Sequence, residues 1–140
     1  MNDAIIGDHL APGASIGSKV FGPITQTDIV RYQGASGDFQ PIHHDPAFAA
    51  RSGLPQPLVI GMLPAGLVAG WIAETFGADN VRYFRVRWNA SVWPGDTLTV
   101  RGSIARRYRD DEGDKIDIEL PCSNQDDRIV LHCAMTVLIP

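Results

Sequence analysis

The sequence predicts an α+β domain in which an antiparallel sheet curls around one long apolar helix. Segments with helical signals come first, up to residue 77, and strand-like alternation follows from residue 82 to the end. The helical segment over residues 61–77 is apolar almost all the way round, which is typical of a helix that is buried rather than lying on a surface. With 140 residues the chain can form one real core but not two, so we expect a single domain over residues 1–140.

The first half is predicted to be helical after an irregular segment rich in Gly, Ala and Pro over residues 1–17. Residues 25–36 are expected to form a short helix, with a threonine that can cap it and an aspartate in its first turn. Residues 45–53 are expected to form another, which begins with an Asp–Pro pair and ends at a glycine. Residues 61–77 are the longest predicted helix, in which Pro64 is compatible only with the first turn.

The second half changes to the alternation of apolar and polar residues that is typical of half-buried strands. The turn sequences PGD, RDDEGD and NQDD separate the alternating segments. The predicted strands are residues 82–93, 97–109, 115–120 and 128–139. The last of them is apolar on both faces, which indicates a central position in the sheet.

Composition and charge narrow the class of protein. A formal net charge of −4 and a pI of about 5.4 argue against nucleic acid as the main partner. No leading stretch resembles a signal peptide, and the most apolar run, residues 58–77, is interrupted by Pro64 and several glycines and is short for a bilayer span. We therefore expect a cytoplasmic protein with no membrane partner, in which Cys122 and Cys133 are buried thiols rather than a disulfide.

One short segment, GASGDFQPIHHDPAFAARSG over residues 34–53, concentrates the candidate chemistry. It places Asp38 and His43 on either side of Pro41, which stiffens a loop between two helices. A carboxylate and an imidazole within hydrogen-bond reach can activate a water and shuttle its proton, because imidazole titrates near neutral pH. From the spacing alone, an Asx-turn at Asp38 and a packed polar role for His43 are favoured over a catalytic pair, because acid–His pairs are common in loops.

A metal site over His43, His44 and Asp45 is disfavoured, because adjacent histidines on an extended segment point in opposite directions. Asp45 has a sufficient structural role as an N-cap. We therefore expect no metal ion, and we expect His44 to lie at the surface or behind the site. Ser36 and Ser52 lack the G-x-S-x-G surroundings of an activated nucleophile, and the chain has neither a phosphate loop nor a dinucleotide fingerprint.

The segment ASGDFQPIHHDPAFA, with IGML at residues 60–63, resembles the signature of the MaoC-like dehydratases, the (R)-specific enoyl-CoA hydratase group of the hot-dog fold. In that signature the pattern A-S-x-D-x-N-P-[IL]-H-x-D-x-x-x-A is followed by H-G-M-L. The later WNASVWPGDTLTVRGSI, residues 88–104, resembles the strand–turn–strand of the same family. The likeness covers most of the chain from about residue 20 onward.

The resemblance implies a hot-dog fold in which residues 61–76 are the central helix. It implies that a helical overhanging segment carries Asp38 and His43 as a catalytic pair, and that the backbone N–H of Gly61 polarises the thioester carbonyl of the substrate. The role of Gly61 also makes physical sense, since the start of a helix offers free N–H groups and the positive end of its dipole to a developing oxyanion.

Three positions depart from the family pattern. Gln40 stands in place of the asparagine, Ile60 in place of the histidine before Gly61, and Ala69 where many relatives carry a serine. Further apolar residues expected near the substrate are Leu58, Met62, Leu63 and Trp71. Together they predict an apolar pocket that prefers a long or bulky acyl group.

The implied function is (R)-specific hydration of 2-enoyl-CoA thioesters, or dehydration of 3-hydroxyacyl thioesters, in fatty-acid or related acyl metabolism. No metal or redox cofactor is implied, because coenzyme A, or an acyl-carrier protein in its place, arrives as part of the substrate. A homodimer or larger assembly is implied, since a curled sheet leaves strand edges exposed. Two alternatives stay open: a weakly active or structural subunit of a hetero-oligomeric dehydratase, and an acyl-CoA thioesterase.

Overall fold

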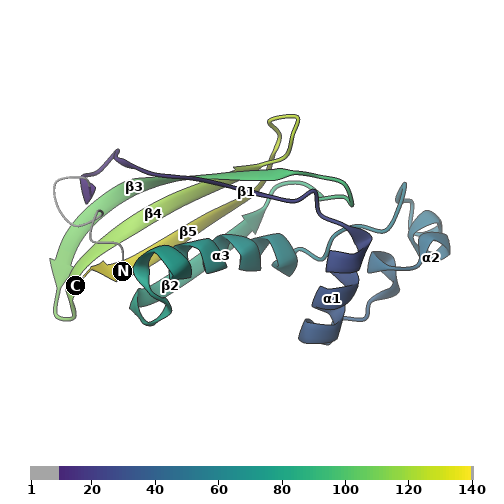
Figure 1. Cartoon of the computed structure of the whole chain (residues 1–140), viewed down its shortest axis with the longest axis horizontal. Helices are drawn as coiled ribbons and strands as arrows, with labels where there is room; N and C mark the ends of the chain where they lie inside the picture. Colours follow the sequence, from purple (N-terminus) through teal and green to yellow (C-terminus); the bar gives the residue numbers. More distant parts are fainter. Residues whose placement is uncertain (1–9, 140) are drawn as a thin grey trace.

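The computed structural model describes residues 10–139, which form an antiparallel sheet of five strands curled around a central helix (Figure 1). The strand order is β1-β3-β4-β5-β2, so that β4 occupies the centre and β1 and β2 the two edges. The predicted α+β class is therefore confirmed. Residues 1–9 and 140 of the predicted domain lie outside the described residues.

The elements follow the predicted order. They are β1 (Ser15–Phe21), α1 (Gln26–Ser36), the 3-10 helix η3 (Pro41–His43), α2 (Pro46–Arg51), α3 (Met62–Phe76), the 3-10 helix η4 (Ala78–Asn80), β2 (Val81–Trp88), β3 (Leu98–Asp110), β4 (Gly113–Ser123) and β5 (Ile129–Ile139). Most predicted boundaries lie within three residues of the observed ones.

Strand β1 is the element that the sequence does not predict, and its first residues belong to the segment expected to be irregular. Its own pattern is weak, because Gly17 adopts a positive φ of 99° and most of its residues are exposed. The strand exists because it pairs with β3, from Ser15 opposite Ser103 to Phe21 opposite Leu98. The expectation of irregular structure over residues 15–17 is therefore wrong, and the cause is a partner strand far along the chain.

Strand β2 is shorter than predicted, because residues 89–93 leave the sheet after Trp88. The N–H of Asn89 still donates to the carbonyl of Val130 on β5. At the other end of this stretch the carbonyl of Val92 accepts from the N–H of Val59, at 2.9 Å. The stretch therefore joins the sheet to the segment that precedes α3.

The core lies between the concave face of the sheet and α3. Its largest fully buried side chains are Leu10, Ile29, Ile72, Leu98, Ile104, Ile116, Ile118, Leu120, Leu131, Val68, Val100 and Val130. Cys122 and Cys133 are free, buried thiols, as predicted. Burial raises the pKa of Cys122 to about 11 and that of Cys133 to about 12, which makes both thiols unreactive at neutral pH.

Helix α3 is not buried on every side, in contrast to the prediction. Met62, Gly66, Gly70 and Glu74 are exposed, and their spacing of four residues places them on one stripe of the helix. A Cβ atom added at Gly66 or Gly70 would meet no heavy atom within 4 Å. The sheet therefore covers α3 only in part, and the exposed stripe stays free for a close approach by another chain.

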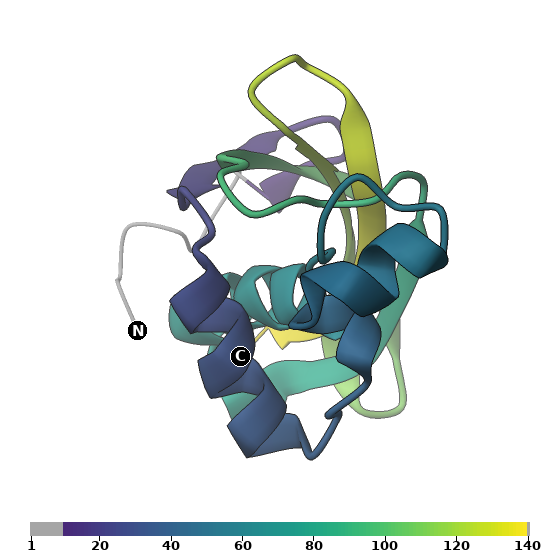
Figure 2. The same cartoon turned by 90° about the vertical axis from the view of Figure 1, so that its right-hand side faces the viewer.

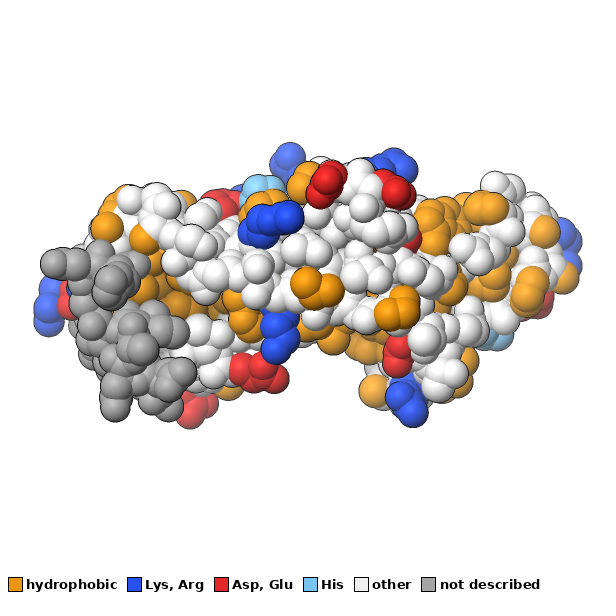
Figure 3. Space-filling model, turned by 45° about the horizontal axis from the view of Figure 1, so that its top comes forward, with side chains coloured by type: hydrophobic (Ala, Val, Ile, Leu, Met, Phe, Trp, Pro, Cys, Tyr) orange, Lys and Arg blue, Asp and Glu red, His pale blue; other side chains and the backbone are white. Residues whose placement is uncertain are grey.

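Helices α1 and α2 form an overhang beyond the sheet, at the end where α3 begins (right of Figure 1). Figure 2 faces this end and shows α1 and α2 on either side of α3. Apolar side chains gather on the same end of the molecule, on the right of Figure 3. None of the helices formed by residues 10–139 combines the length and the hydropathy that a bilayer span requires.

Candidate active site

The overhang brings Asp38 and His43 to the start of α3. Helix α1 ends at Ser36, and its C-cap residue is Gly37. Gly37 has a φ of 75°, a left-handed conformation that favours glycine, and it turns the chain into the loop that begins with Asp38. Oδ1 of Asp38 accepts the N–H of Gln40 at 3.2 Å, which is an Asx-turn. Oδ2 lies 4.0 Å from Nε2 of His43. The two interpretations that the spacing allowed are thus compatible, because each uses a different oxygen of the carboxylate.

The imidazole of His43 is held in one orientation. Its Nδ1 lies 2.8 Å from the carbonyl oxygen of Leu58. Because a carbonyl can only accept, Nδ1 carries the proton, and in the neutral ring Nε2 is left as an acceptor. The His43 side chain is 12% exposed, and that of Asp38 is 45% exposed. Because Asp38 is open to solvent and His43 is nearly buried, a water molecule can reach the imidazole from the side of the carboxylate.

The 4.0 Å separation between Oδ2 and Nε2 is too long for a direct hydrogen bond. Two acceptors at this separation are suited to a water molecule between them that donates one hydrogen to each. The arrangement can therefore hold a water and remove its proton.

Gly61 lies at the N-cap of α3 without a side-chain hydrogen bond to cap the helix. Its N–H donates to no group among residues 10–139. The free N–H of Gly61 and the helix dipole favour an anionic oxygen there. Gly61 and His43 line the same cavity, of about 340 Å³. The other lining residues are Leu58, Val59, Pro64, Trp88, Asn89, Ala90, Ser91 and Val92.

Trp88 is a residue of this cavity that the sequence reasoning missed. Its Nε1–H donates to the carbonyl of Gly61 at 2.9 Å, which fixes the peptide that follows Gly61. A Cβ atom added at Gly61 would lie only 2.8 Å from Nε1 of Trp88, so the close approach requires glycine. In the sequence Trp88 is only one residue of the predicted strand 82–93, and nothing local indicates the helix start as its partner.

The neighbouring His44 and Asp45 have other partners. Oδ1 of Asp45 accepts the N–H groups of Ala47 and Phe48, at 2.8 and 3.0 Å, which confirms its predicted role as the N-cap of α2. Nδ1 of His44 lies 3.0 Å from Nε2 of Gln33, away from the Asp38–His43 pair. Within the part of the chain that the structure describes, no three His, Cys, Asp or Glu residues are grouped as metal ligands.

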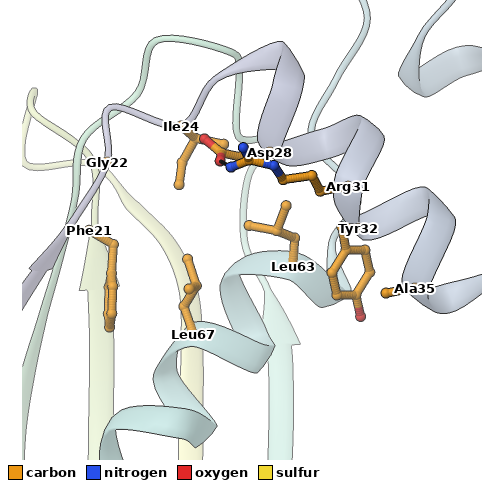
Figure 4. A pocket seen from close by; sticks show the side chains of 9 residues that line it. All are labelled: Phe21, Gly22, Ile24, Asp28, Arg31, Tyr32, Ala35, Leu63 and Leu67. Atoms are coloured by element: carbon orange, nitrogen blue, oxygen red, sulfur yellow. Dashed lines mark ion pairs between the residues drawn. The ribbon is translucent and has the colours of Figure 1, made fainter.

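A second cavity, of about 450 Å³, lies between β1, α1 and α3 and is lined by none of the three predicted catalytic residues, Asp38, His43 and Gly61 (Figure 4). Its walls are mainly apolar: Phe21, Gly22, Ile24, Tyr32, Ala35, Leu63 and Leu67. Arg31 and Asp28 lie beside it, 3.7 Å apart. Hydrogen bonds from Thr25 lower the pKa of Asp28, so this carboxylate stays charged.

The positions that depart from the family pattern do not all meet the cavity of His43. Ile60 is 4% exposed and belongs to the hydrophobic core. Leu58 lines the cavity beside His43, whereas Leu63 lines the second cavity. In this structure Ile60 therefore packs in the core and does not line the cavity that contains His43.

The fold and the cavity describe a hot-dog domain with an acid–imidazole pair on an overhang and a free helix start beside it. The model of the MaoC like domain family matches residues 9–121, so the chain belongs to the MaoC-like family. A solved structure titled as the (R)-hydratase from A. caviae involved in PHA biosynthesis has the same fold, with a TM-score of 0.81 at 20% identity. That match covers 96% of this chain and 100% of the solved one.

Two curated relatives are similar in sequence. The (R)-specific enoyl-CoA hydratase of Aeromonas caviae is 30% identical over 95 residues, which are 66% of this chain and 69% of the relative. The enoyl-CoA hydratase ChsH3 of Mycobacterium tuberculosis is 32% identical over 97 residues, which are 67% of this chain. The match spans only 34% of the length of ChsH3, so this chain corresponds to one part of that larger protein.

Proposed function

We propose that this protein hydrates 2-enoyl thioesters of coenzyme A with (R) specificity, and in reverse dehydrates 3-hydroxyacyl thioesters. The observation that carries the proposal is the pair of acceptors, Oδ2 of Asp38 and Nε2 of His43, which face each other at 4.0 Å in the overhang of a MaoC-like domain. Similarity to the enoyl-CoA hydratase ChsH3 supports the reaction, and similarity to the (R)-specific enoyl-CoA hydratase of Aeromonas caviae supports both the reaction and its stereochemistry. In this proposal the whole chain, residues 1–140, acts as one such domain.

In the proposed reaction a water lies between Asp38 and His43. As one of them removes a proton, the water oxygen forms a bond to C3, and the electrons of the C2–C3 double bond move through C2 to the thioester oxygen. The N–H of Gly61 stabilises the enolate oxygen. The removed proton is then returned to C2, which restores the thioester and the protonation state of the pair. Because the addition is neutral in redox terms, no oxidant, reductant or separate cofactor is required.

We also propose a cytoplasmic location and no nucleic-acid or membrane partner. The support is the two buried free thiols, which are typical of a reducing compartment, and the acidic net charge of −4.

The direct test is a spectrophotometric assay of crotonyl-CoA and longer enoyl-CoAs in the presence of a thiol reagent. Loss of the enoyl absorbance without a free thiol supports the hydratase. Release of a free thiol would instead show a thioesterase. If neither signal appears, the result supports the structural-subunit alternative, and the same assay is repeated with candidate partner subunits.

A further prediction concerns the length of the acyl chain of the substrate. The cavity that contains His43 has apolar walls from Leu58, Val59 and Val92. Each methylene that leaves water contributes about 0.8 kcal/mol. We expect kcat/KM to rise at least about tenfold from a four-carbon to an eight-carbon enoyl-CoA, which requires only about 1.4 kcal/mol. A flat series, or a preference for crotonyl-CoA, would show that these walls do not select the acyl chain.

The third prediction concerns assembly. Among residues 10–139, strand β2 pairs with β5 alone and forms an edge of the sheet, and Tyr83 and Trp88 on it are 53% and 51% exposed. An exposed edge next to the free stripe of α3 is suited to a second copy of the chain. We expect at least a homodimer by light scattering at micromolar concentration.

Two matched variants locate the interface. Gly66→Leu adds bulk on the exposed stripe of α3 and should weaken the dimer, because glycine there permits close approach. Gly34→Leu adds the same bulk to an equally open helical site on α1 and should leave the dimer intact. A wild-type protein that is monomeric at micromolar concentration would contradict the prediction, and equal effects of the two variants would place the interface elsewhere.

A further inference from the structure

Two glutamines of α1 hold the backbone of the candidate catalytic pair. Nε2 of Gln26 donates to the carbonyl oxygen of His43 at 2.9 Å. Nε2 of Gln33 donates to the carbonyl oxygen of Asp38 at 3.0 Å. One amide side chain thus binds each member of the pair, at its main chain rather than at its reacting atoms.

The spacing of the two glutamines explains how one helix does this. Residues seven apart are almost two turns apart, at 3.6 residues per turn, so Gln26 and Gln33 lie on the same face of α1. The start of this helix is itself fixed by a capping box, in which the N–H of Thr25 donates to Asp28 and the N–H of Asp28 donates to Oγ1 of Thr25. Helix α1 is therefore a rigid support for the loop.

The amide of Gln33 is fixed by hydrogen bonds as well as by packing. It is 3% exposed, and a buried amide is costly unless its hydrogens are bonded. One N–H of Gln33 Nε2 donates to the carbonyl oxygen of Asp38, and the other donates to Nδ1 of His44, with 3.0 Å between Nε2 and Nδ1. With an amide donor at Nδ1, neutral His44 carries its proton on Nε2. Gln33 thus binds the loop both before and after His43.

We propose that Gln26 and Gln33 are positioning residues that keep Oδ2 of Asp38 and Nε2 of His43 at the separation that a bridging water requires. This inference rests on the proposed function. Neither glutamine touches the reacting atoms. The effect comes through geometry, since a misplacement of about 1 Å in a catalytic group can lower a rate up to about 100-fold.

The kinetic test replaces each amide by a side chain of similar length, in Gln26→Met and Gln33→Met. We expect kcat to fall about tenfold or more in each, with KM within about threefold of the wild-type value. The control is Arg31→Met on the same helix, because the Arg31 side chain is 77% exposed and its ion pair is with Asp28. This control should keep wild-type kcat. Unchanged kcat in both glutamine variants would overturn the proposal.

A double-mutant cycle separates positioning from a merely structural role. In an Asp38→Asn background, Gln33→Met should change kcat less than about twofold, because the acid that it positions is already absent. A structural role predicts the opposite: the same fractional loss of kcat in both backgrounds, accompanied by a lower melting temperature. That result would overturn the proposal.

A measurement without substrate tests the positioning role of the glutamines independently of the proposed reaction. In ¹⁵N spectra of the imidazoles, wild-type His43 should show a proton on Nδ1 and His44 a proton on Nε2. In Gln33→Met the preference of His44 should be lost. In Gln26→Met, which releases the main chain of His43, the His43 nitrogens should shift towards averaged values. If the wild type turns over no enoyl-CoA, the proposed function fails, and these spectra still decide whether the glutamines fix the pair. Unchanged His43 signals in both variants would refute the positioning role.

Discussion

Replacing Asp38 by Asn, or His43 by Ala, should lower turnover of an enoyl-CoA at least about 100-fold, the usual scale for a positioned acid–base group. Asp38→Asn keeps a side-chain oxygen for the Asx-turn with Gln40 and removes only the negative charge and the second acceptor that faces His43. His43→Ala removes the other acceptor. Either change leaves a water with one partner where the reaction needs two.

The matched control is His44→Ala, which deletes the adjacent imidazole. His44 bonds to Gln33 and not to Asp38, so its loss should affect turnover much less than the loss of His43. Far-UV circular dichroism and the denaturation midpoint should show that all three variants are folded. Near-wild-type turnover in Asp38→Asn or His43→Ala would show that the residue concerned is not catalytic.

The second large effect is expected at Gly61. A proline there removes the N–H that we assign to the enolate oxygen, and the observed φ of −55° is one that proline can adopt. Loss of one such donor lowers kcat by about 10²–10³ in comparable sites. We expect a loss of that size from Gly61→Pro, measured as kcat with crotonyl-CoA and an eight-carbon enoyl-CoA.

A side chain at position 61 would also collide with Trp88. The loss of the N–H must therefore be separated from this collision by comparing two variants in a background without the indole. In a Trp88→Leu background, which removes the indole 2.8 Å from the new Cβ, both Gly61→Ala and Gly61→Pro can be accommodated. Alanine keeps the N–H and should stay within about tenfold of its parent, whereas proline should show the full loss. Equal losses in the two variants would mean that the N–H of Gly61 has no part in the reaction.

Features that depend on residues within a turn or two of each other follow from the sequence. Asp45 caps α2 and Thr25 caps α1, because a side-chain oxygen reaches N–H groups two or three residues later. The long helix predicted over residues 61–77 is observed over Met62–Phe76, because a continuous apolar segment and the glycines at its two ends bound it locally. The same local signals placed Asp38 and His43 in one stiff loop and, through the family resemblance, marked Gly61.

Contacts between segments that are distant in the sequence could be found only in the tertiary structure. Strand β1, the indole of Trp88 on Gly61 and the exposed stripe of α3 all depend on segments distant in the sequence. The bonds from Gln26 to His43 and from Gln33 to Asp38 have the same origin, because they form only when the loop folds back along α1. Periodicity reports which face of an element is apolar, but the partner of that face is set by how the elements pack. The distance of 4.0 Å between Asp38 and His43, on which the proposed chemistry depends, is a result of that packing.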